Sequence, residues 1–520
     1  MNGADALVHT LLDAGVDTFF ANPGTSEMHF VAALDRATGM RCVLGLFEGV
    51  VTGAADGYYR MRQQPAGTLL HLGPGLANGL ANLHNAKKAR SGIVNVIGEH
   101  ATHHLALDAP LTSDIEGLAR PMSHWVHTVG SVQAIRGDGR EAVAQARARP
   151  GRIASLVLPA DMAWSDAGSA AAPLEPVREA APRAMDEKQV AAAAEVLRRH
   201  GPRTLLLLGG RAARASVATW AGRVAAATGC ALMSEFYTER IERGAGRVAL
   251  PRLPYSVDAA LEVLSRFDHI VLVHAREPVA FFAYPGKPGK LAPAGTAFHV
   301  LSDHEQDAEE AMQMLCERLD ATRSDPVLVE CTPPEPANEQ GPLSPAGIAA
   351  VLAALLPENA IVVDEAVTTG RAFDAATRTA APHDWLTNMG GSIGFGLPVA
   401  VGAAIAAPDR RVVALEGDGS AMYTLQSLWT MARESLDVTV LVFANRDYRI
   451  LRGEFAHVGA GEPGQRANDM LSLDRPALDW VALATGHGVP ARRVTTLAEL
   501  ADALRRGLAT EGPGLIEVVL

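Results

Sequence analysis

Short apolar runs alternate with stretches of helical spacing along the first third of the chain. Residues 16–20, 41–46, 68–72 and 93–97 are apolar runs of strand length, and 48–61 and 76–89 carry small and apolar residues at helical spacing. Apolar runs without polar alternation fit strands that are buried on both faces, as in parallel sheets. The pattern therefore predicts a parallel sheet with helices on both faces.

The same alternation returns twice further along the chain. The middle third has apolar runs at 204–208 and 269–273 with helical patterns at 188–199 and 212–228, and the last third has apolar runs at 360–363, 411–415 and 438–444. Residues 166–187 and 331–345 are rich in Pro, Ala and Glu, which is typical of exposed linkers. We therefore predict an α/β chain with three doubly wound parallel-sheet domains, over residues 1–165, 188–325 and 343–520.

Composition and charge narrow the classes of partner. The chain has 520 residues, of which 48% are hydrophobic and 20% charged, with a net charge of −12 and no Lys/Arg run. This balance argues against nucleic acid or an anionic membrane as a partner. No apolar stretch reaches the roughly 20 residues of a membrane span. The four cysteines lack CxxC spacing and the N-terminus lacks a basic region followed by an apolar one, so we expect a cytoplasmic protein.

The last third carries a turn suited to a diphosphate and a metal ion. Gly417-Asp418-Gly419-Ser420 ends an apolar run, and residues 421–434 have helical spacing. Glycines allow close backbone approach, and N–H groups at a helix start can receive a diphosphate. The next apolar run ends at Asn445, and parallel strand ends face one crevice. Asp418, Asn445 and the backbone carbonyl of Asp447 could therefore supply oxygen ligands to one Mg²⁺.

The spacing of GDGS, 24 residues and then Asn445 resembles the diphosphate–magnesium motif of thiamine-diphosphate enzymes. The family usually shows two asparagines where this chain has Ala444-Asn445, and the second asparagine is the family's ligand. The resemblance implies that thiamine diphosphate and Mg²⁺ are the cofactors. It places the metal on Asp418, Asn445 and Asp447, and the cofactor against the residues Gly417, Asp418, Gly419, Ser420, Asn445 and Tyr448.

The first third resembles the other half of such a site. Glu48, followed by Gly53-Ala54-Ala55-Asp56-Gly57-Tyr58, is similar to the pyrimidine-binding segment of thiamine-diphosphate decarboxylases and acetolactate synthases. Without the resemblance, a glutamate at a helix start would be only a favourable dipole contact. The resemblance implies that Glu48 is catalytic and bonds N1′ of the aminopyrimidine, which favours the cofactor's imino tautomer.

Three further positions match cofactor contacts of the family. The segment Gly390-Gly391-Ser392-Ile393-Gly394-Phe395 resembles the one that touches the aminopyrimidine through its backbone. The resemblance implies that Gly391 lies against the cofactor and that Ile393 holds it bent. Thr368 matches a position that contacts the diphosphate.

The motifs near the N-terminus come closest to benzoylformate decarboxylase. Asn22-Pro23-Gly24-Thr25 resembles a segment of that enzyme in which a hydroxyl contacts the substrate carboxylate, so Thr25 is a candidate catalytic residue. His71 matches a histidine that helps proton transfer, and its ordinary pKa suits that role. A lone histidine after a strand is otherwise a common structural residue.

Two departures leave the substrate open. Residues 278–284 lack the middle-domain histidine of benzoylformate decarboxylase, and Asp114-Ile115 stands near the position of a Phe-Gln pair in acetolactate synthases. The Gly209-Gly210-Arg211 turn lacks a GxGxxG fingerprint, so FAD is not expected.

The resemblance extends over essentially the whole chain and implies an activity. We expect decarboxylation of a small-molecule 2-oxo acid with aldehyde release, or carboligation to a 2-hydroxyketone. The alternatives are an acetolactate synthase-type carboligase and a flavin-containing 2-oxo acid oxidase. The cofactor would span the first and last domains, which need not touch within one chain. In the family the site lies between subunits, so the resemblance implies a homodimer or homotetramer with active sites between subunits.

Overall fold

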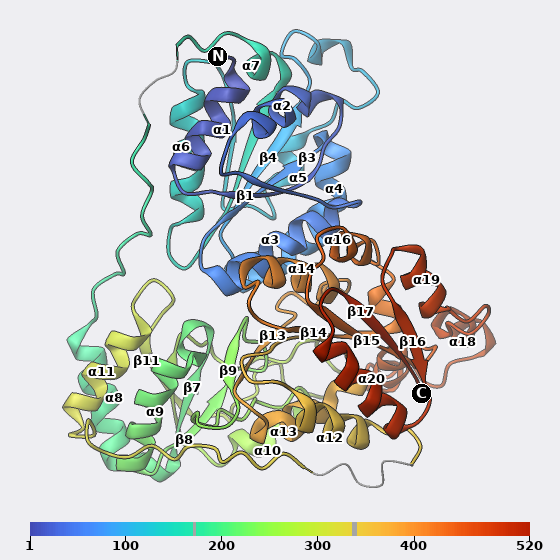
Figure 1. The fold of residues 1–520 in the computed structure, drawn as a ribbon. Coiled ribbons are helices and arrows are strands. Elements are labelled where there is room, and N and C mark those ends of the chain that lie inside the picture. The colour runs from blue at the N-terminus through green and yellow to red at the C-terminus, as the bar shows by residue number, and fades with distance from the viewer. Residues whose placement is uncertain (170–172, 335–340) are drawn as a thin grey trace.

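The computed structural model describes residues 1–169, 173–334 and 341–520. The chain forms three α/β units, each built on one sheet, and residues 173–186 run as an extended segment to the second unit (Figure 1). Every strand pairing within these sheets is parallel except one. The predicted α/β fold with three parallel-dominated sheets is therefore confirmed.

The first unit is a six-stranded parallel sheet in the order β2-β1-β3-β4-β6-β5. Its strands are β1 (Thr18–Asn22), β2 (Arg41–Leu44), β3 (Ala66–Leu70), β4 (Ile93–Glu99), β5 (Trp125–Thr128) and β6 (Ile153–Pro159). One face is covered by α1 (Gly3–Asp13), α2 (Met28–Arg36), α6 (Ile135–Ala146) and α7 (Ala160–Trp164), and the other by α3 (Glu48–Arg62), α4 (Leu72–Ala89) and α5 (Ile115–Ala119). Strands buried on both faces explain why their sequences are continuous apolar runs.

The middle unit is a four-stranded parallel sheet in the order β11-β10-β7-β8. Its strands are β7 (Thr204–Leu208), β8 (Ala231–Ser234), β10 (His269–Val273) and β11 (Ala297–Ser302). One face is covered by α8 (Glu187–His200), α9 (Ala215–Thr228) and α11 (Ala308–Arg318), and the other by α10 (Val257–Leu264).

The third unit is a seven-stranded sheet in the order β16-β17-β15-β14-β12-β13-β9. Its strands are β9 (Ile241–Arg243), β12 (Ile361–Glu365), β13 (His383–Thr387), β14 (Val412–Gly417), β15 (Val438–Ala444), β16 (Ala491–Val494) and β17 (Gly514–Val519). One face is covered by α12 (Pro345–Leu355), α13 (Phe373–Ala376) and α20 (Leu497–Ala509), and the other by α14 (Gly396–Ala406), α16 (Ser427–Arg433) and α19 (Trp480–Gly486). The edge strand β9 comes from the middle third of the chain and is the one antiparallel strand.

One detail differs from the sequence predictions. The single helix expected over 421–434 is wrong, because the chain forms α15 (Asp418–Ala421), a turn and then α16. The predicted linkers hold no helix or strand over 166–186 and 331–344 where the chain is described, although residues 170–172 and 335–340 of these two predictions lie outside the described residues. The domain bounds 1–165, 188–325 and 343–520 stay predictions.

The first and third units share one apolar core. Side chains of α3 and α4 belong to the same buried cluster as those of α14 and α16. Helices α3 and α14 approach closely because glycines face the partner backbone: a side chain at Gly57 would collide with the Val399 carbonyl, and one at Gly402 with the Ala54 carbonyl. We predicted that these units need not touch within one chain, but they pack directly against each other.

No helix in the described parts of the chain combines the length and apolar character needed to cross a membrane.

Candidate functional site

The Asp418 turn lies at the carboxyl edge of the third sheet, where β14 and β15 end side by side. Gly417 pairs with Phe443 in the parallel register, so Asp418 and Asn445 follow neighbouring strand ends. The Asp418 carboxylate is 3% exposed and accepts the backbone N–H groups of Gly419 at 3.0 Å and Arg446 at 2.7 Å. The predicted convergence of the two strand ends is confirmed.

The donor set of this turn fits a hard divalent cation. Burial raises the pKa of Asp418 to about 6, and no ion pair to it is formed within the described residues. The Asn445 amide oxygen accepts the Asp447 N–H at 3.0 Å, while the Asp447 carboxylate is bound by Arg452 at 2.7 Å. The backbone carbonyl of Asp447, rather than its carboxylate, therefore remains as the candidate metal ligand, as the sequence suggested. No group of three or more His, Cys, Asp or Glu forms a metal cluster in the described ranges, so phosphate oxygens would have to complete the shell.

The same turn forms a tight cradle. A side-chain carbon at Gly419 would lie 2.5 Å from Cε1 of Tyr448, so the ring of Tyr448 covers the glycine. The Ser420 hydroxyl donates to the Gly417 carbonyl at 3.0 Å. These contacts bring Gly417, Ser420 and Tyr448 together as the sequence predicted, around a helix start.

The loop 388–394 is held in a fixed shape by side chains from two units. Asn388 accepts the backbone N–H groups of Gly390 at 3.1 Å and Gly391 at 2.8 Å. From α4 of the first unit, Asn85 donates to the Ser392 carbonyl at 2.8 Å and Asn82 to the Gly394 carbonyl at 3.1 Å. Gly391 has φ +76°, and Ile393 on this loop is half-buried.

Two buried glutamates behind this loop were missed by the sequence analysis. Glu365 accepts the Gly396 N–H at 2.9 Å and the Asn388 amide at 3.3 Å, so it supports the loop. Glu416 lies opposite it on β14, just before the Asp418 turn. Burial raises the pKa of Glu365 to about 7, and burial beside Glu365 raises the pKa of Glu416. Nothing in the linear spacing of these residues indicates that they meet.

Glu48 is the first residue of α3 and is 7% exposed. Its carboxylate accepts the Asn78 amide N–H at 2.9 Å. Asn82 joins this end of α3 to the loop 388–394, because its amide donates both to the Gly49 carbonyl at 2.8 Å and to the Gly394 carbonyl. The Asn82 side chain therefore contacts both the Glu48 end of α3 and the predicted pyrimidine-contacting loop.

His71 has a buried carboxylate as its partner. Its Nδ1 lies 2.8 Å from Oε2 of Glu27, which also accepts the Gly24 N–H at 2.7 Å. Gly24 packs against the imidazole so closely that a side chain there would collide with the ring. Thr25 is exposed at the start of the same short turn and directly follows Gly24, the residue that packs on His71. Glu27 was missed, although a glutamate three residues after Gly24 is a capping pattern that could have pointed to it.

Three of the ten non-glycine residues with left-handed φ in the described parts of the chain lie just beyond strand ends near the site. Leu72, Val367 and Arg446 have φ of +51°, +49° and +56°, and each lies two residues beyond the end of its strand, β3, β12 or β15. Such conformations are costly for residues with side chains and concentrate at functional sites. Thr368, half-buried, directly follows Val367 at this edge.

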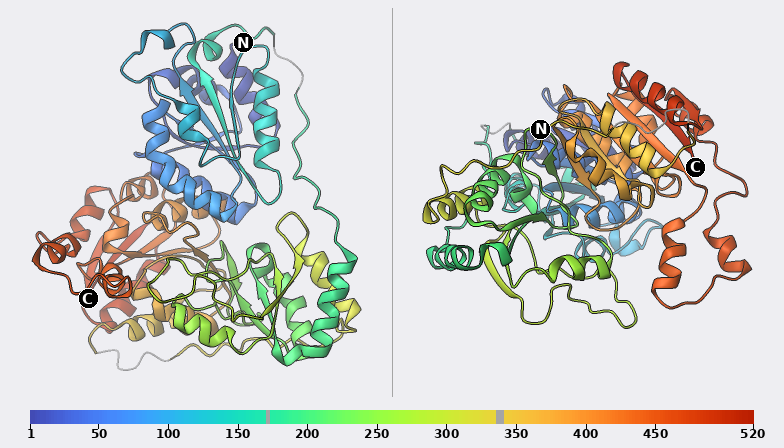
Figure 2. Two further views of the ribbon diagram at one scale, coloured as in Figure 1. Left: turned by 180° about the vertical axis from the view of Figure 1, so that it is seen from behind. Right: turned by 90° about the horizontal axis from the view of Figure 1, so that it is seen from below.

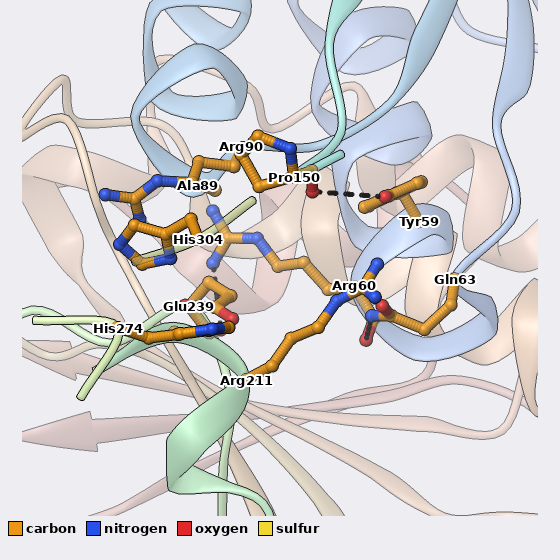
Figure 3. A pocket seen from close by; sticks show the side chains of 11 residues that line it. Tyr59, Arg60, Gln63, Ala89, Arg90, Pro150, Arg211, Glu239, His274 and His304 are labelled. Atoms are coloured by element: carbon orange, nitrogen blue, oxygen red, sulfur yellow. Dashed lines mark hydrogen bonds between the residues drawn. The ribbon is translucent and has the colours of Figure 1, made fainter. Parts of the chain in front are cut away.

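A separate basic cavity lies between the first and middle units (Figure 3). It has a volume of about 20 Å³ and is lined among others by Arg90, Arg211, His274 and His304. The Gly209-Gly210-Arg211 turn, considered above for a flavin, forms part of its wall. A space of about 20 Å³ holds about one water molecule.

Replacing Glu27 by glutamine should flatten the pH dependence of stability. Burial raises the pKa of Glu27 above its usual 4.5, so its contribution is present below pH 4.5 and is lost as the pH rises through the folded-state value. The wild-type protein should therefore lose stability between acid and neutral pH that the variant keeps, by about 1.4 kcal/mol for each pH unit separating the two pKa values. Thermal unfolding at pH 5 and 7.5 measures this, and parallel curves for the two proteins would contradict it.

Comparison with known proteins follows the same division of the chain. Residues 1–120 match the family model for the thiamine pyrophosphate enzyme N-terminal TPP binding domain, and residues 368–518 match that for the C-terminal TPP binding domain. A Mycobacterium tuberculosis protein, IlvX, provisionally assigned as an acetolactate synthase large subunit, is 50% identical over 100% of this chain and 99% of its own. Benzoylformate decarboxylase of Pseudomonas aeruginosa is 31% identical over 97% of this chain and 96% of its own.

A solved structure has the same fold. The thiamine diphosphate-dependent 4-hydroxybenzoylformate decarboxylase of Rhodococcus jostii superposes with a TM-score of 0.85 at 25% identity, over 99% of this chain and 98% of that one. The chain belongs to the thiamine pyrophosphate enzyme family, within the group of acetolactate synthase-like proteins and benzoylformate decarboxylases.

Proposed function

We propose that this protein is a thiamine-diphosphate- and magnesium-dependent enzyme that decarboxylates a 2-oxo acid, with release of an aldehyde or carboligation to a 2-hydroxyketone. The observation that carries the proposal is the Asp418 turn, a buried carboxylate without a cationic partner among the described residues, beside Asn445 at a parallel strand edge. Ligands of open α/β sheets bind at such edges.

Some of the candidate residues would bind the cofactor and the metal ion, and others would transfer protons. Asp418, Asn445 and the Asp447 carbonyl would hold Mg²⁺. The diphosphate would lie on the N–H groups of Gly417–Ser420, with Tyr448 and Thr368 at its sides. When bound, thiamine diphosphate supplies an electron sink for breaking the carbon–carbon bond next to a keto group.

Glu48 would hold a proton at N1′ of the aminopyrimidine. Its burial supports this role, because a low dielectric strengthens a hydrogen bond to a charged group. Gly391 and Ile393, on a loop fixed by Asn388 and Asn85, would position the ring.

His71 and Thr25 would act on the substrate. Thr25 would orient the substrate carboxylate with its hydroxyl. The Glu27 carboxylate fixes which imidazole nitrogen of His71 faces the first unit's interior, leaving Nε2 to donate a proton to the product. FAD is not part of the proposal.

A second candidate is an acetolactate synthase-type carboligase. The 50% identity to IlvX of M. tuberculosis favours it, since that protein carries this assignment. Formation of acetolactate from pyruvate alone separates this activity from aldehyde release.

The test is turnover by the purified protein, reconstituted with thiamine diphosphate and Mg²⁺, against a panel of 2-oxo acids. CO₂ release and products are followed by mass spectrometry, and cofactor binding by calorimetry. Cofactor-dependent CO₂ release with an aldehyde or hydroxyketone is expected. Cofactor binding without turnover of any donor would overturn the activity, and no cofactor binding would overturn the assignment of the site.

We further propose that the complete site forms between two subunits, with Glu48 of one chain beside the Asp418 turn of the other, even though Asn82 also joins the Glu48 end of α3 to the loop 388–394 within one chain. Mixing Glu48→Gln protein with Asp418→Ala protein tests this, because a mixed dimer would contain one site with both native residues. Random exchange should then restore about a quarter of wild-type activity, since about half of the dimers are mixed and each has one working site. No recovery after verified subunit exchange would instead locate the whole site within one chain.

A further inference from the structure

Three histidines of the middle unit lie ring beside ring. His269 is the first residue of β10, His299 lies within β11 and His200 is the last residue of α8. The ring centroids of His200 and His269 are 4.7 Å apart, and those of His269 and His299 are 5.4 Å apart. This group, here termed the histidine triplet, joins the end of one helix to two neighbouring strands.

The parallel register places two of these rings on one face of the sheet. His269 pairs with Ala297 in the register of β10 and β11, and Val271 pairs with His299. Because side chains two apart on a strand point to the same face, His269, Val271 and His299 share a face. Val271 belongs to the apolar core beneath α8, so His200 at the end of α8 lies over this same face.

The facing ring nitrogens have the separation that a metal ion gives to its ligands. Nδ1 of His269 lies 3.3 Å from Nε2 of His299. Two imidazole nitrogens at about 2.0–2.1 Å from a tetrahedral Zn²⁺ lie about 3.3–3.4 Å from each other. Rings bound in this way have centroids about 5 Å apart, between the two values of the histidine triplet. Two rings therefore have the spacing of metal ligands without any movement of the backbone.

The two facing rings are available in the form that binds a metal ion. Burial lowers the pKa of the His299 imidazole below its usual value, and the neighbouring His269 lowers it further. Neutral imidazole is the metal-binding form. Without metal, the 3.3 Å contact is a hydrogen bond in which one nitrogen carries the proton, and an ion requires only the tautomer of His269 with its proton on Nε2.

The histidine triplet lies away from the candidate cofactor site. The opposite end of β10 is followed by His274, which lines the cavity against the first unit. Figure 2 shows α8 and α11, in green and yellow, on the outer side of the middle unit and away from the third unit in orange and red. His269 and His299 are half-buried and His200 is exposed, so an ion can reach the rings from solvent.

We propose that His269 and His299 bind one divalent transition-metal ion of the Zn²⁺ type per chain, with His200 and water completing its coordination. The described ranges contain no preformed group of three or more His, Cys, Asp or Glu spaced for a metal ion, so His200 would join by rotation of its exposed side chain. The Asp268 carboxylate, next in the chain to His269, is bound by Arg203 at 2.8 and 2.6 Å and is not part of the site.

This site is chemically separate from the proposed magnesium site. Imidazole nitrogen suits Zn²⁺, Cu²⁺ and Ni²⁺, whereas Mg²⁺ takes oxygen ligands. The inference therefore does not depend on the proposed function. A bound ion would tie the end of α8 to β10 and β11 and stabilise the middle unit.

Calorimetric titration with Zn²⁺ tests the site. The full-length protein carries no histidine tag and is kept in thiamine diphosphate with excess Mg²⁺, so that Zn²⁺ does not occupy the Asp418 turn. We expect one Zn²⁺ per chain at pH 7.5 and weaker binding at pH 5.5, because protons compete for the ring nitrogens. His269→Gln and His299→Gln should each lower the Zn²⁺ affinity at least about tenfold, since even the loss of an outer-shell partner costs about 10- to 100-fold.

The matched control is His9→Gln, the same substitution at an exposed histidine of α1 whose Nδ1 lies 2.8 Å from the Asp5 carbonyl oxygen. It should leave the Zn²⁺ affinity unchanged. Zn²⁺ should also raise the unfolding temperature of the wild type and of this control, but not that of the His269→Gln and His299→Gln proteins.

Two results would overturn the inference. One is the absence of Zn²⁺ binding at pH 7.5. The other is Zn²⁺ binding of equal strength in the wild type, His269→Gln and His299→Gln, as expected if the ion bound instead at the exposed Cys42. Because the two ligands are changed singly, a folding defect in one variant leaves the other as the test.

Co²⁺ in place of Zn²⁺ gives a second readout of the ligands. The visible bands of a tetrahedral Co²⁺ ion should appear in the wild type and be lost in His299→Gln. Bands that persist in both His269→Gln and His299→Gln would contradict the assignment.

Discussion

Replacing Asp418 by alanine is expected to weaken Mg²⁺-dependent binding of thiamine diphosphate at least about 100-fold, or about 2.7 kcal/mol, and to abolish turnover. The Asp418 carboxylate accepts only backbone N–H groups, whereas the carboxylate of Asp447 in the same donor set is paired with the Arg452 side chain. Calorimetric titration with the cofactor in the presence of Mg²⁺ measures the change.

Loss of folding can be separated from loss of binding. Because burial raises the pKa of Asp418 to about 6, its contribution to the stability of the cofactor-free protein is lost as the pH rises through about 6. At pH 7.5 alanine removes the cost of holding this carboxylate ionised but also removes the acceptor of the Gly419 and Arg446 N–H groups, so the cofactor-free variant should melt close to the wild type. The matched control is Asp447→Ala in the neighbouring loop, whose carboxylate faces Arg452 and should change cofactor affinity by less than about threefold. Equal losses in the two variants would contradict the ligand assignment.

Replacing Glu48 by glutamine is expected to lower turnover by about 10²–10⁴-fold, the usual worth of a positioned proton-transfer group. Glutamine keeps the shape of the side chain and can still accept the Asn78 N–H, but cannot hold the transferable proton. Cofactor affinity should change by less than about tenfold, because about one neutral hydrogen bond is altered. Steady-state rates with saturating cofactor provide the measurement.

Glu517 offers a matched control for this substitution. It is 1% exposed on β17 and pairs with Arg493, away from the strand ends of the site. Glu517→Gln should affect unfolding temperature but leave the rate per folded molecule within about twofold. If the Glu48→Gln enzyme were as active as the Glu517→Gln enzyme, Glu48 would have no catalytic role.

Much of the fold could be read from the sequence because its strands are buried on both faces. The run at 438–444 matches β15 residue for residue, and that at 204–208 matches β7. The helix predicted over 421–434 was wrong for a tertiary reason. The Thr424 hydroxyl donates to the Gly394 carbonyl at 3.0 Å, and this contact draws residues 422–426 into a turn against the loop 388–394. Helical spacing carries no information about such a contact.

Part of the candidate site could likewise be predicted from the sequence, and part could not. Asp418 and Asn445 could be placed together because parallel strands end at one edge. Glu27 and Glu365 could not be assigned, because their roles depend on partners 44 and 23 residues away, His71 and Asn388. The edge strand β9 also escaped prediction, since three residues from the middle third carry no periodicity of their own.

The close packing of α3 on α14 has a consequence for how the chain is made. The glycine-lined face of α3 leaves the ribosome more than 300 residues before α14 is synthesised. At 5–20 residues per second this face waits about 20–70 s for α14, the helix that covers it in the folded protein. The nascent first unit must therefore carry an uncovered apolar surface through most of translation. A chaperone that protects that surface should raise the yield of full-length protein more than it raises the yield of residues 188–325 expressed alone.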